Sequence, residues 1–343
     1  MSTKKLFGMV FAALLAGAVF AADVVLNPEH PDRYVVVKGD TLWDISAMFL
    51  RDPWLWPEVW YVNPQIANPH LIYPGDILTL VYVDGKPQLR MTRGYPTVNL
   101  SPAIREQSLD QAIPTIPMDA IQAFLNRTIV VDKEELDTAP YVVQSAGEHV
   151  ITGAGDRVYV RGIDGTDTAI YDFYKPGDAY IDPDTKEVLG HEALYVGTGP
   201  VQKFGDPATF LLTETTREVR VGDRLRPAED PFSLPYFQPH APATDIEGHI
   251  ISVIDGVTQI GQFNVVAIDL GTREGMEAGH VMRIFQKGAV IRDTVSGKRG
   301  DSVKLPDEEA GLVMIFRTFE KVSFGLVMKA TSSLHINDLV RTP

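Results

Sequence analysis

The chain has 343 residues, of which 45% are hydrophobic, and it carries a formal net charge of −14 at neutral pH. Because a chain this acidic repels nucleic acid and anionic lipid, we expect no nucleic-acid partner and at most a peripheral association with membranes. Cysteine is absent, which excludes disulfides, a thiol nucleophile, thiolate metal sites and a lipid-modified N-terminal cysteine.

The first residues have the pattern of an export signal. Lys4 and Lys5 precede an apolar stretch over residues 6–20, and the small residues Ala21 and Ala22 follow. The stretch is short for a membrane span, and no later apolar run reaches the roughly 18 residues that a membrane helix needs. We therefore expect residues 1–21 to be cleaved as a signal peptide, and the remaining ~320 residues to form two or three exported domains.

The next window predicts a compact domain that begins with a strand and a helix. Residues 34–37 (Tyr-Val-Val-Val) predict the strand, and residues 38–41 (Lys-Gly-Asp-Thr) predict a turn. Apolar residues then recur at helical spacing, at Leu42, Ile45, Met48 and Phe49. Thr41 is expected to cap this helix at its N-terminus, with Asp44 three residues on.

A second helix and a second strand complete the window. The helix is expected to start near Pro57 and to stop at Asn63-Pro64. Residues 74–76 (Pro-Gly-Asp) predict a turn, and residues 77–80 predict the second strand. All four tryptophans of the chain lie between the two strands.

This window resembles the LysM domain, a small βααβ carbohydrate-binding fold. The resemblance is carried by the order and spacing of residues 34–45, 63–64 and 74–78. The resemblance implies a LysM domain over residues 33–83, with a groove between the turn after the first strand and the loop before the second strand. N-acetylated amino sugars of peptidoglycan glycan strands are the implied ligand. The implied glycan-binding residues are Gly39, Asp40, Thr41, Asn63, Ile66, Leu71, Ile72 and Tyr73.

Each of these assignments has a structural alternative. Asp40 and Asn63 can serve only as turn and helix-end residues. Core packing accounts for Trp43 and Trp60 in so small a domain, while an exposed member of residues 52–57 (Asp-Pro-Trp-Leu-Trp-Pro) would be available to a ligand or another protein.

The rest of the chain predicts a linker, a helix and two β units. Residues 84–116 are rich in proline and glycine, and residues 117–125 have apolar residues on one helical face. Short β-branched and aromatic runs follow, at 128–131, 141–143, 157–160, 194–196, 210–212, 265–268, 281–285, 312–316 and 324–328. The fold class is therefore α+β multidomain, with a small βααβ domain followed by a mostly β C-terminal region of two related small sheets or barrels.

A weak internal repeat supports the two units. Residues 214–226 align without gaps to residues 329–341, and residues 175–178 pair with 277–280 if the second unit has a polar insertion near 292–302. We expect one unit with its helix at 117–227, a proline-rich linker at 228–245 and a second unit at 246–343. Convergent turn chemistry is the alternative explanation. The basic tip Lys298-Arg299 is either a solvated loop or a contact for an acidic partner.

Nothing in the sequence predicts catalysis, a cofactor or a metal site. The histidines are scattered without ligand spacing, and His191-Glu192 lacks the second histidine of a zinc helix. Acidic pairs such as Glu134-Glu135 fit solvated turns, whereas a glycosidase acid needs burial to raise its pKa. We therefore expect a protein that is not an enzyme.

The whole arrangement resembles the secretin-associated LysM proteins of type IV pili, whose C-terminal part is similar to a flagellar basal-body domain. The segments that carry this resemblance are 52–60, 113–121 and 155–162. It implies a periplasmic adaptor that binds peptidoglycan and an outer-membrane secretin ring. A peptidoglycan hydrolase or its regulator, and a flagellar or generic wall-binding structural protein, remain as alternatives.

Overall fold

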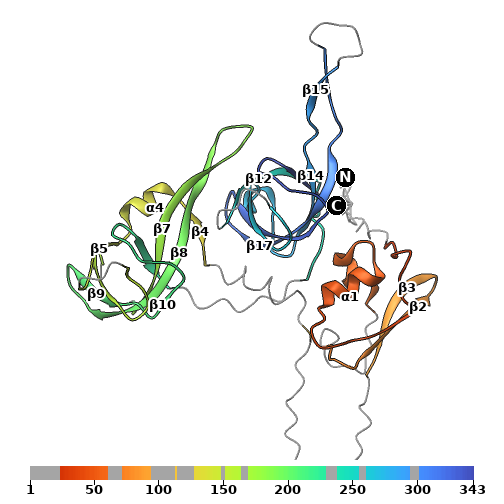
Figure 1. Cartoon of the computed structure of the whole chain (residues 1–343), viewed down its shortest axis with the longest axis horizontal. Helices are drawn as coiled ribbons and strands as arrows, with labels where there is room; N and C mark the ends of the chain where they lie inside the picture. Colours follow the sequence, from red (N-terminus) through yellow and green to blue (C-terminus); the bar gives the residue numbers. More distant parts are fainter. Residues whose placement is uncertain are drawn as a thin grey trace, which may run out of the picture.

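The structure is a computed structural model of the chain (Figure 1). It describes residues 24–60, 72–93, 113, 127–147, 151–163, 169–228, 238–254, 260–293 and 301–343. The expected signal peptide and the helix at 117–125 lie outside these residues. The predicted end of the second helix at Asn63-Pro64 is wrong, because the helix covers only Trp56–Val59 and the backbone of Trp60 is already extended, with φ of −74° and ψ of 113°. Within the described ranges, no helix has the length and apolar character that crossing a bilayer requires.

The N-terminal domain has the predicted order of strand, helix, helix and strand. It contains β1 (Arg33–Val35), α1 (Leu42–Phe49), the 3-10 helix η1 (Pro53–Leu55), α2 (Trp56–Val59), β2 (Ile77–Val83) and β3 (Lys86–Thr92). The strands form an antiparallel sheet in the order β1-β2-β3. Thr41 caps α1 as predicted, because its Oγ1 accepts the backbone N–H of Asp44 at 3.1 Å.

The linker expected over residues 84–116 starts later, because residues 86–92 form β3. Asp84 and Gly85, with φ of 51° and 79°, make the two-residue turn between β2 and β3. Asp-Gly is favoured in such turns because both positions need a positive φ. Pro87 is tolerated because β3 is an edge strand of this sheet.

Three of the four tryptophans are core residues of this domain. Trp43, Trp54 and Trp56 expose only 5%, 5% and 1% of their surface. Trp60 is half-buried, and its ring lies edge-on to Trp56 at 6.2 Å. Residues 52–57 therefore present no exposed tryptophan, and the ligand-contact alternative for them is wrong. The reason is size, since a small domain fills its core with a few large side chains.

The first β unit follows. Its elements are β4 (Ile129–Val131), α4 (Lys133–Thr138), β5 (Tyr141–Ser145), β6 (Arg157–Arg161), β7 (Ile170–Ile181), β8 (Val188–Lys203), β9 (Ala208–Leu211), β10 (Glu214–Thr215) and β11 (Arg224–Pro227). Pairing between β8 and β9 turns the path β8-β7-β11-β5-β6-β9 into a ring of six strands. Strands β4 and β10 add to β8 from outside the ring.

The second β unit is a closed barrel. Its elements are β12 (Glu247–Val253), β13 (Val265–Ile268), the 3-10 helix η2 (Thr272–Glu274), β14 (Val281–Gln286), β15 (Val290–Arg292), β16 (Ser302–Lys304), β17 (Glu308–Thr318), β18 (Ser323–Ala330) and β19 (Leu339–Arg341). Around the barrel the strands run β12-β13-β18-β17-β14-β19. β15 and β16 form a separate two-stranded arm that projects from it (Figure 1).

The two units share one strand order. Matching each strand by its neighbours aligns β5, β6, β7, β8, β9 and β11 with β12, β13, β14, β17, β18 and β19, in chain order. Shared turn chemistry alone does not produce six strands paired in the same cyclic order, so the structure supports a true repeat. The finer alignment of 175–178 with 277–280 is wrong, because the former lies inside β7 and the latter precedes β14.

The β7–β8 hairpin of the first unit contacts the second barrel. Tyr180, which is 4% exposed, places its ring 6.4 Å from the ring of Phe324. Glu187 accepts hydrogen bonds from Lys321 at 2.7 Å and from Arg273 at 3.2 Å. An apolar contact flanked by ion pairs thus joins the two units.

One four-residue turn recurs through the described part of the chain. A side chain at the fourth position accepts the N–H of the first residue at 2.7–3.2 Å, and the fourth N–H donates to the first carbonyl. The third residue has a positive φ, from 65° at Phe263 to 104° at Gly279. These turns are 37–40, 73–76, 153–156, 220–223, 261–264, 277–280 and 335–338. Aspartate closes all but two of them, where Asn264 and His280 take its place.

Gly325 tests the packing of the second barrel. A Cβ there would lie 2.4 Å from Cγ2 of Val313, inside the barrel. We expect Gly325→Ala to lower the free energy of unfolding by about 1–3 kcal/mol, because overpacking forces neighbours from their rotamers. Urea unfolding followed by far-UV circular dichroism measures the loss. Gly261→Ala is the matched control, since its Cβ would meet nothing closer than 3.8 Å, and equal losses in both variants would contradict the assignment.

Candidate functional site

The two turns that flank the predicted groove lie side by side at one end of the N-terminal sheet. The N–H of Val36 donates to the carbonyl of Asp76 at 2.9 Å, and the N–H of Gly75 donates to the carbonyl of Val36 at 2.8 Å. These bonds continue the β1–β2 ladder, in which Val35 pairs with Ile77. The structure thus brings the turn at 37–40 next to the turn at 73–76.

Asp40 holds the first wall in place. Its Oδ2 accepts the backbone N–H of Val37 at 2.8 Å and the hydroxyl of Tyr34 at 2.9 Å. Burial and the bond to Asp40 raise the pKa of Tyr34, so this hydroxyl stays a donor at neutral pH. Gly39 is exposed at the tip of the turn with φ of 101°, a value that side-chain-bearing residues rarely adopt. Its backbone is therefore accessible to a ligand.

The second wall is built on Tyr73 and closed by Asp76. Asp76 is 2% exposed, and its Oδ2 accepts the N–H of Tyr73 at 2.9 Å. The half-buried Tyr73 ring lies under the guanidinium of Arg93 at 5.2 Å, within cation–π range. Arg93 was missed by sequence reasoning because it follows β3, and the Asp84-Gly85 hairpin signal would have placed it beside β2.

Two of the predicted glycan-binding residues are buried. Thr41 is 3% exposed, and its hydroxyl both caps α1 and donates to Asp44 at 2.7 Å. Ile72 is fully buried, with 0% of its surface exposed. We therefore assign the side chains of Thr41 and Ile72 to the fold of the walls rather than to contact with a sugar. Asn63, Ile66 and Leu71 lie outside the described residues.

The groove walls are therefore made of exposed backbone and half-buried polar or aromatic groups. Gly39 and Gly75 are exposed, whereas Asp40 and Tyr73 are half-buried. Such a surface offers hydrogen bonds and an aromatic contact to an uncharged ligand. No general acid is needed for binding of this kind, and Asp40 is occupied by two structural hydrogen bonds.

A second concave region lies between the N-terminal domain and the second barrel. Its volume is about 430 Å³, and Asn27, Asp44 and Arg51 line it opposite Gln262 and Lys329. Nearby, Arg283 of the barrel donates to Asp52 at 3.3 Å. Of the predicted glycan-binding residues that the structure describes, none lines this hollow.

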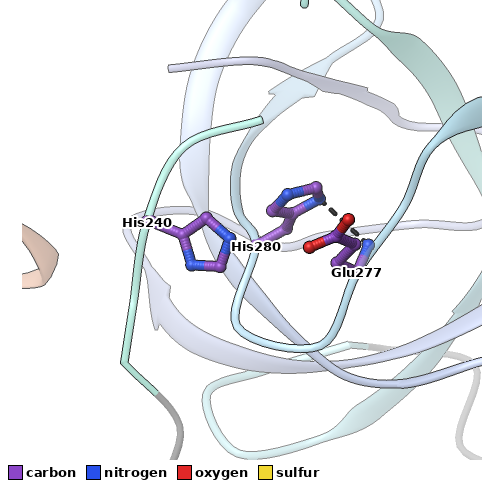
Figure 2. Close-up of side chains that lie close together, drawn as sticks. All are labelled: His240, Glu277 and His280. Atoms are coloured by element: carbon purple, nitrogen blue, oxygen red, sulfur yellow. Dashed lines mark hydrogen bonds between the residues drawn. The ribbon is translucent and has the colours of Figure 1, made fainter. Parts of the chain in front are cut away.

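One group of side chains in the described ranges has the composition of a divalent-metal site. His240, Glu277 and His280 each offer a ligand atom within 4.8 Å of the others (Figure 2). Backbone bonds hold the histidines together, because the N–H of His240 donates to Gly279 at 3.1 Å and Val281 donates to His240 at 2.9 Å. Sequence spacing gave no sign of this group, since residues 240 and 280 meet only in the fold.

The geometry gives His280 a structural role. Its Nδ1 accepts the backbone N–H of Glu277 at 3.2 Å, which closes the turn at 277–280 (Figure 2). Burial lowers the pKa of His280, and the neighbouring His240 lowers it further. The ring is therefore neutral at neutral pH, which is the state that can accept this bond.

Comparison with known proteins identifies the N-terminal domain. Residues 34–81 match the LysM domain family, so this part of the chain is a LysM domain. LysM domains bind N-acetylated sugars of peptidoglycan and are generally non-catalytic. "Uncharacterized protein YqbP" of Bacillus subtilis (strain 168) is 38% identical over 60 residues, which is 15% of this chain and 27% of that protein. The chain thus matches about a quarter of the length of that relative.

Asp76 tests how the second wall is held. We expect Asp76→Ala to lower the free energy of unfolding of the LysM domain by about 1.5–3 kcal/mol, because the N–H of Tyr73 loses a charged acceptor in a buried site. Asp76→Asn should lose less, since its amide oxygen can still accept. Tryptophan fluorescence during urea unfolding reports on this domain alone, as all four tryptophans lie in it. Equal losses in the two variants would show that the hydrogen bond is not the cause.

Proposed function

We propose that this protein is a non-catalytic periplasmic adaptor that binds peptidoglycan and holds an outer-membrane secretin of a pilus machine to the cell wall. The LysM domain at residues 34–81 is the observation that carries the proposal. The export signal expected at residues 1–21 supports a periplasmic location. The β region supplies the part that contacts the secretin.

Glycan binding by this domain rests on shape and hydrogen bonds. The chain carries a net charge of −14, so bulk attraction to an acidic polymer is absent. Backbone groups at the exposed Gly39 and Gly75 can bond the amide of an N-acetyl sugar, and the Tyr73 ring can contact its methyl group or ring face. One shallow contact of this kind is weak. Several copies of the protein around a secretin ring would bind the wall more tightly together, because each bound copy raises the effective concentration of the next.

The buried acidic residues support a binding role rather than hydrolysis. Burial raises the pKa of Asp223 and of Asp269, which is the property that a glycosidase acid needs. Both carboxylates have structural partners, however. Asp223 accepts the N–H of Arg220 at 2.7 Å to close a turn, and Asp269 lies 3.0 Å from Nδ1 of His249.

The β region is suited to transmit force. Each unit forms a ring of six strands, and rings leave few free strand edges. The contact of Tyr180 with Phe324 and the ion pairs of Glu187 join the units into one body. A platform of this kind can hold an outer-membrane assembly while the LysM domain grips the wall.

The groove is tested with a pair of tyrosine variants. Tyr73→Ala should weaken binding to purified peptidoglycan sacculi by about tenfold, because it removes an aromatic contact with a sugar. Tyr82→Ala is the matched control, since Tyr82 is 63% exposed near the far end of β2. Co-sedimentation of the full chain with sacculi measures both. If Tyr73→Ala and Tyr82→Ala bind as the wild type does, the groove lies elsewhere, and if the wild type stays in the supernatant the proposal fails.

The adaptor role is tested in solubilised outer membranes. A tagged full chain should co-purify with the secretin, identified by mass spectrometry, and the purified chain should leave a peptidoglycan gel uncleared. Retention should persist in Tyr73→Ala, because the secretin contact is assigned to the β region. Clearing of the gel would point to a hydrolase, and recovery of flagellar basal-body proteins without secretin would point to a flagellar structural role.

A further inference from the structure

The shared strand order pairs a hairpin of the first unit with an arm of the second. β7 and β8 correspond to β14 and β17, so the connection between β7 and β8 corresponds to the connection that holds β15 and β16. In both units this connection extends beyond the ring as a hairpin (Figure 1). The β7–β8 hairpin and the β15–β16 arm therefore occupy equivalent positions in the two units, and both protrude from their rings.

The first of these hairpins is already used as a docking element. Its tip places Tyr180 and Leu189, which are 4% and 5% exposed, in an apolar cluster with Phe324 of the second barrel. Its acidic Glu187 meets the basic Lys321 in the turn between β17 and β18. The hairpin of one unit thus covers the β17–β18 face of the next unit along the chain.

The second hairpin has the same build and stays uncovered. Every residue of β15 and β16 is exposed. Ile291 and Val303 are cross-strand partners that expose 44% and 46% of their surface, and Val290 exposes 68%. Arg292 and Lys304 give this arm a basic character in a chain of net charge −14. An exposed apolar hairpin of this kind fits a surface that has an exposed apolar residue of its own.

The first unit has an exposed apolar residue at the matching place. By the strand order, its β8–β9 turn corresponds to the β17–β18 turn that is covered in the second unit. That turn exposes Phe204 by 38%. Asp206 in the same turn bonds Arg161 at 2.9 Å and still has 58% of its side chain exposed. Lys203 is exposed beside Phe204, so this turn carries both charges, as the β17–β18 turn does with Glu320 and Lys321.

We propose that the β15–β16 arm of one copy docks on the β8–β9 face of the first unit of a second copy. Ile291 and Val303 pack against Phe204 of the neighbouring copy. The contact repeats between chains the contact that β7–β8 makes within the chain. This inference goes beyond the proposed function, because it names a partner of the same sequence rather than the wall or the secretin.

The contact is head-to-tail, because the arm and the face are different surfaces. A head-to-tail contact leaves one arm and one face unused in every dimer, so it continues into a ring or a filament. Because the contact is apolar, the association should persist as ionic strength rises.

Complementation between two variants tests the proposal. Ile291→Glu with Val303→Glu removes the arm surface, and Phe204→Glu removes the face. Analytical ultracentrifugation of the wild-type full chain should show dimers and larger species that grow with concentration, up to about 200 µM, a range that detects contacts of even modest affinity. Each variant alone should raise the dissociation constant at least about tenfold. A mixture of the two should form a heterodimer that stops at two copies, since one intact arm and one intact face remain.

The control is Ile336→Glu, because Ile336 is 46% exposed on the same barrel but belongs to the turn at 335–338 rather than to the arm. It should associate as the wild type does, and tryptophan fluorescence and circular dichroism should show that all variants stay folded. A wild type that remains monomeric at the highest concentration overturns the proposal. So does association that survives the arm and face variants, or a mixture that fails to form the heterodimer.

Discussion

One hydrogen bond, from a backbone N–H to a side chain in the same four-residue turn, recurs before helix α1 and before strands of the three larger sheets. In the recurring turn, a side chain three residues along accepts an N–H that would otherwise lose its partner where the next element begins. The third residue needs a positive φ, which is why glycine or asparagine stands there so often. Turns 37–40 and 73–76 build the walls of the LysM groove, and the others start strands of both rings.

The bond does not require a carboxylate. His280 closes its turn with a ring nitrogen and Asn264 closes another with an amide oxygen. The fourth position requires a side-chain acceptor that can reach the N–H of the first residue. The backbone bond from the fourth N–H to the first carbonyl already holds the two residues close together. The LysM domain and the β units share this device although their folds differ, so similar turn sequences alone are weak evidence of common descent. The cyclic order of six strands in each ring is the stronger evidence.

The two rings show how one architecture carries different surfaces. Their interiors are separate apolar cores, one around Phe173 and Phe210 and the other around Ile268 and Val313. Their protruding hairpins differ in charge, with Glu187 on the first and Lys304 on the second. Packing constrains the interior residues strongly, whereas exposed hairpin residues can change with little cost to the fold. The exposed turns and hairpins are therefore the parts of the two rings whose residues can differ most.

Much of the fold could be predicted because its signals are local. The strand at 265–268 matches β13 residue for residue, and Thr41 caps α1 as expected. The lengths of β7 and β8 could not be predicted, because Pro176-Gly177 falls inside β7 at a bulge and resembles a turn. In the candidate site, the LysM resemblance placed Gly39, Asp40 and Tyr73 at the groove walls, and their contact with a glycan stays a prediction. The burial of Thr41 and Ile72 could not be predicted, because the motif does not show which side chains of the groove walls point into the core.

The sequence by itself determined the LysM domain, its capped helix and the acceptor-closed turns, because each depends on residues within about four positions of one another. Only the tertiary structure decided which distant groups meet. Glu187 and Lys321 are 134 residues apart in the chain, and His240 meets His280 only through the second barrel. The physical reason is that an alternating pattern marks a residue as part of a strand and as inward-facing, but it does not specify which strand will lie beside it.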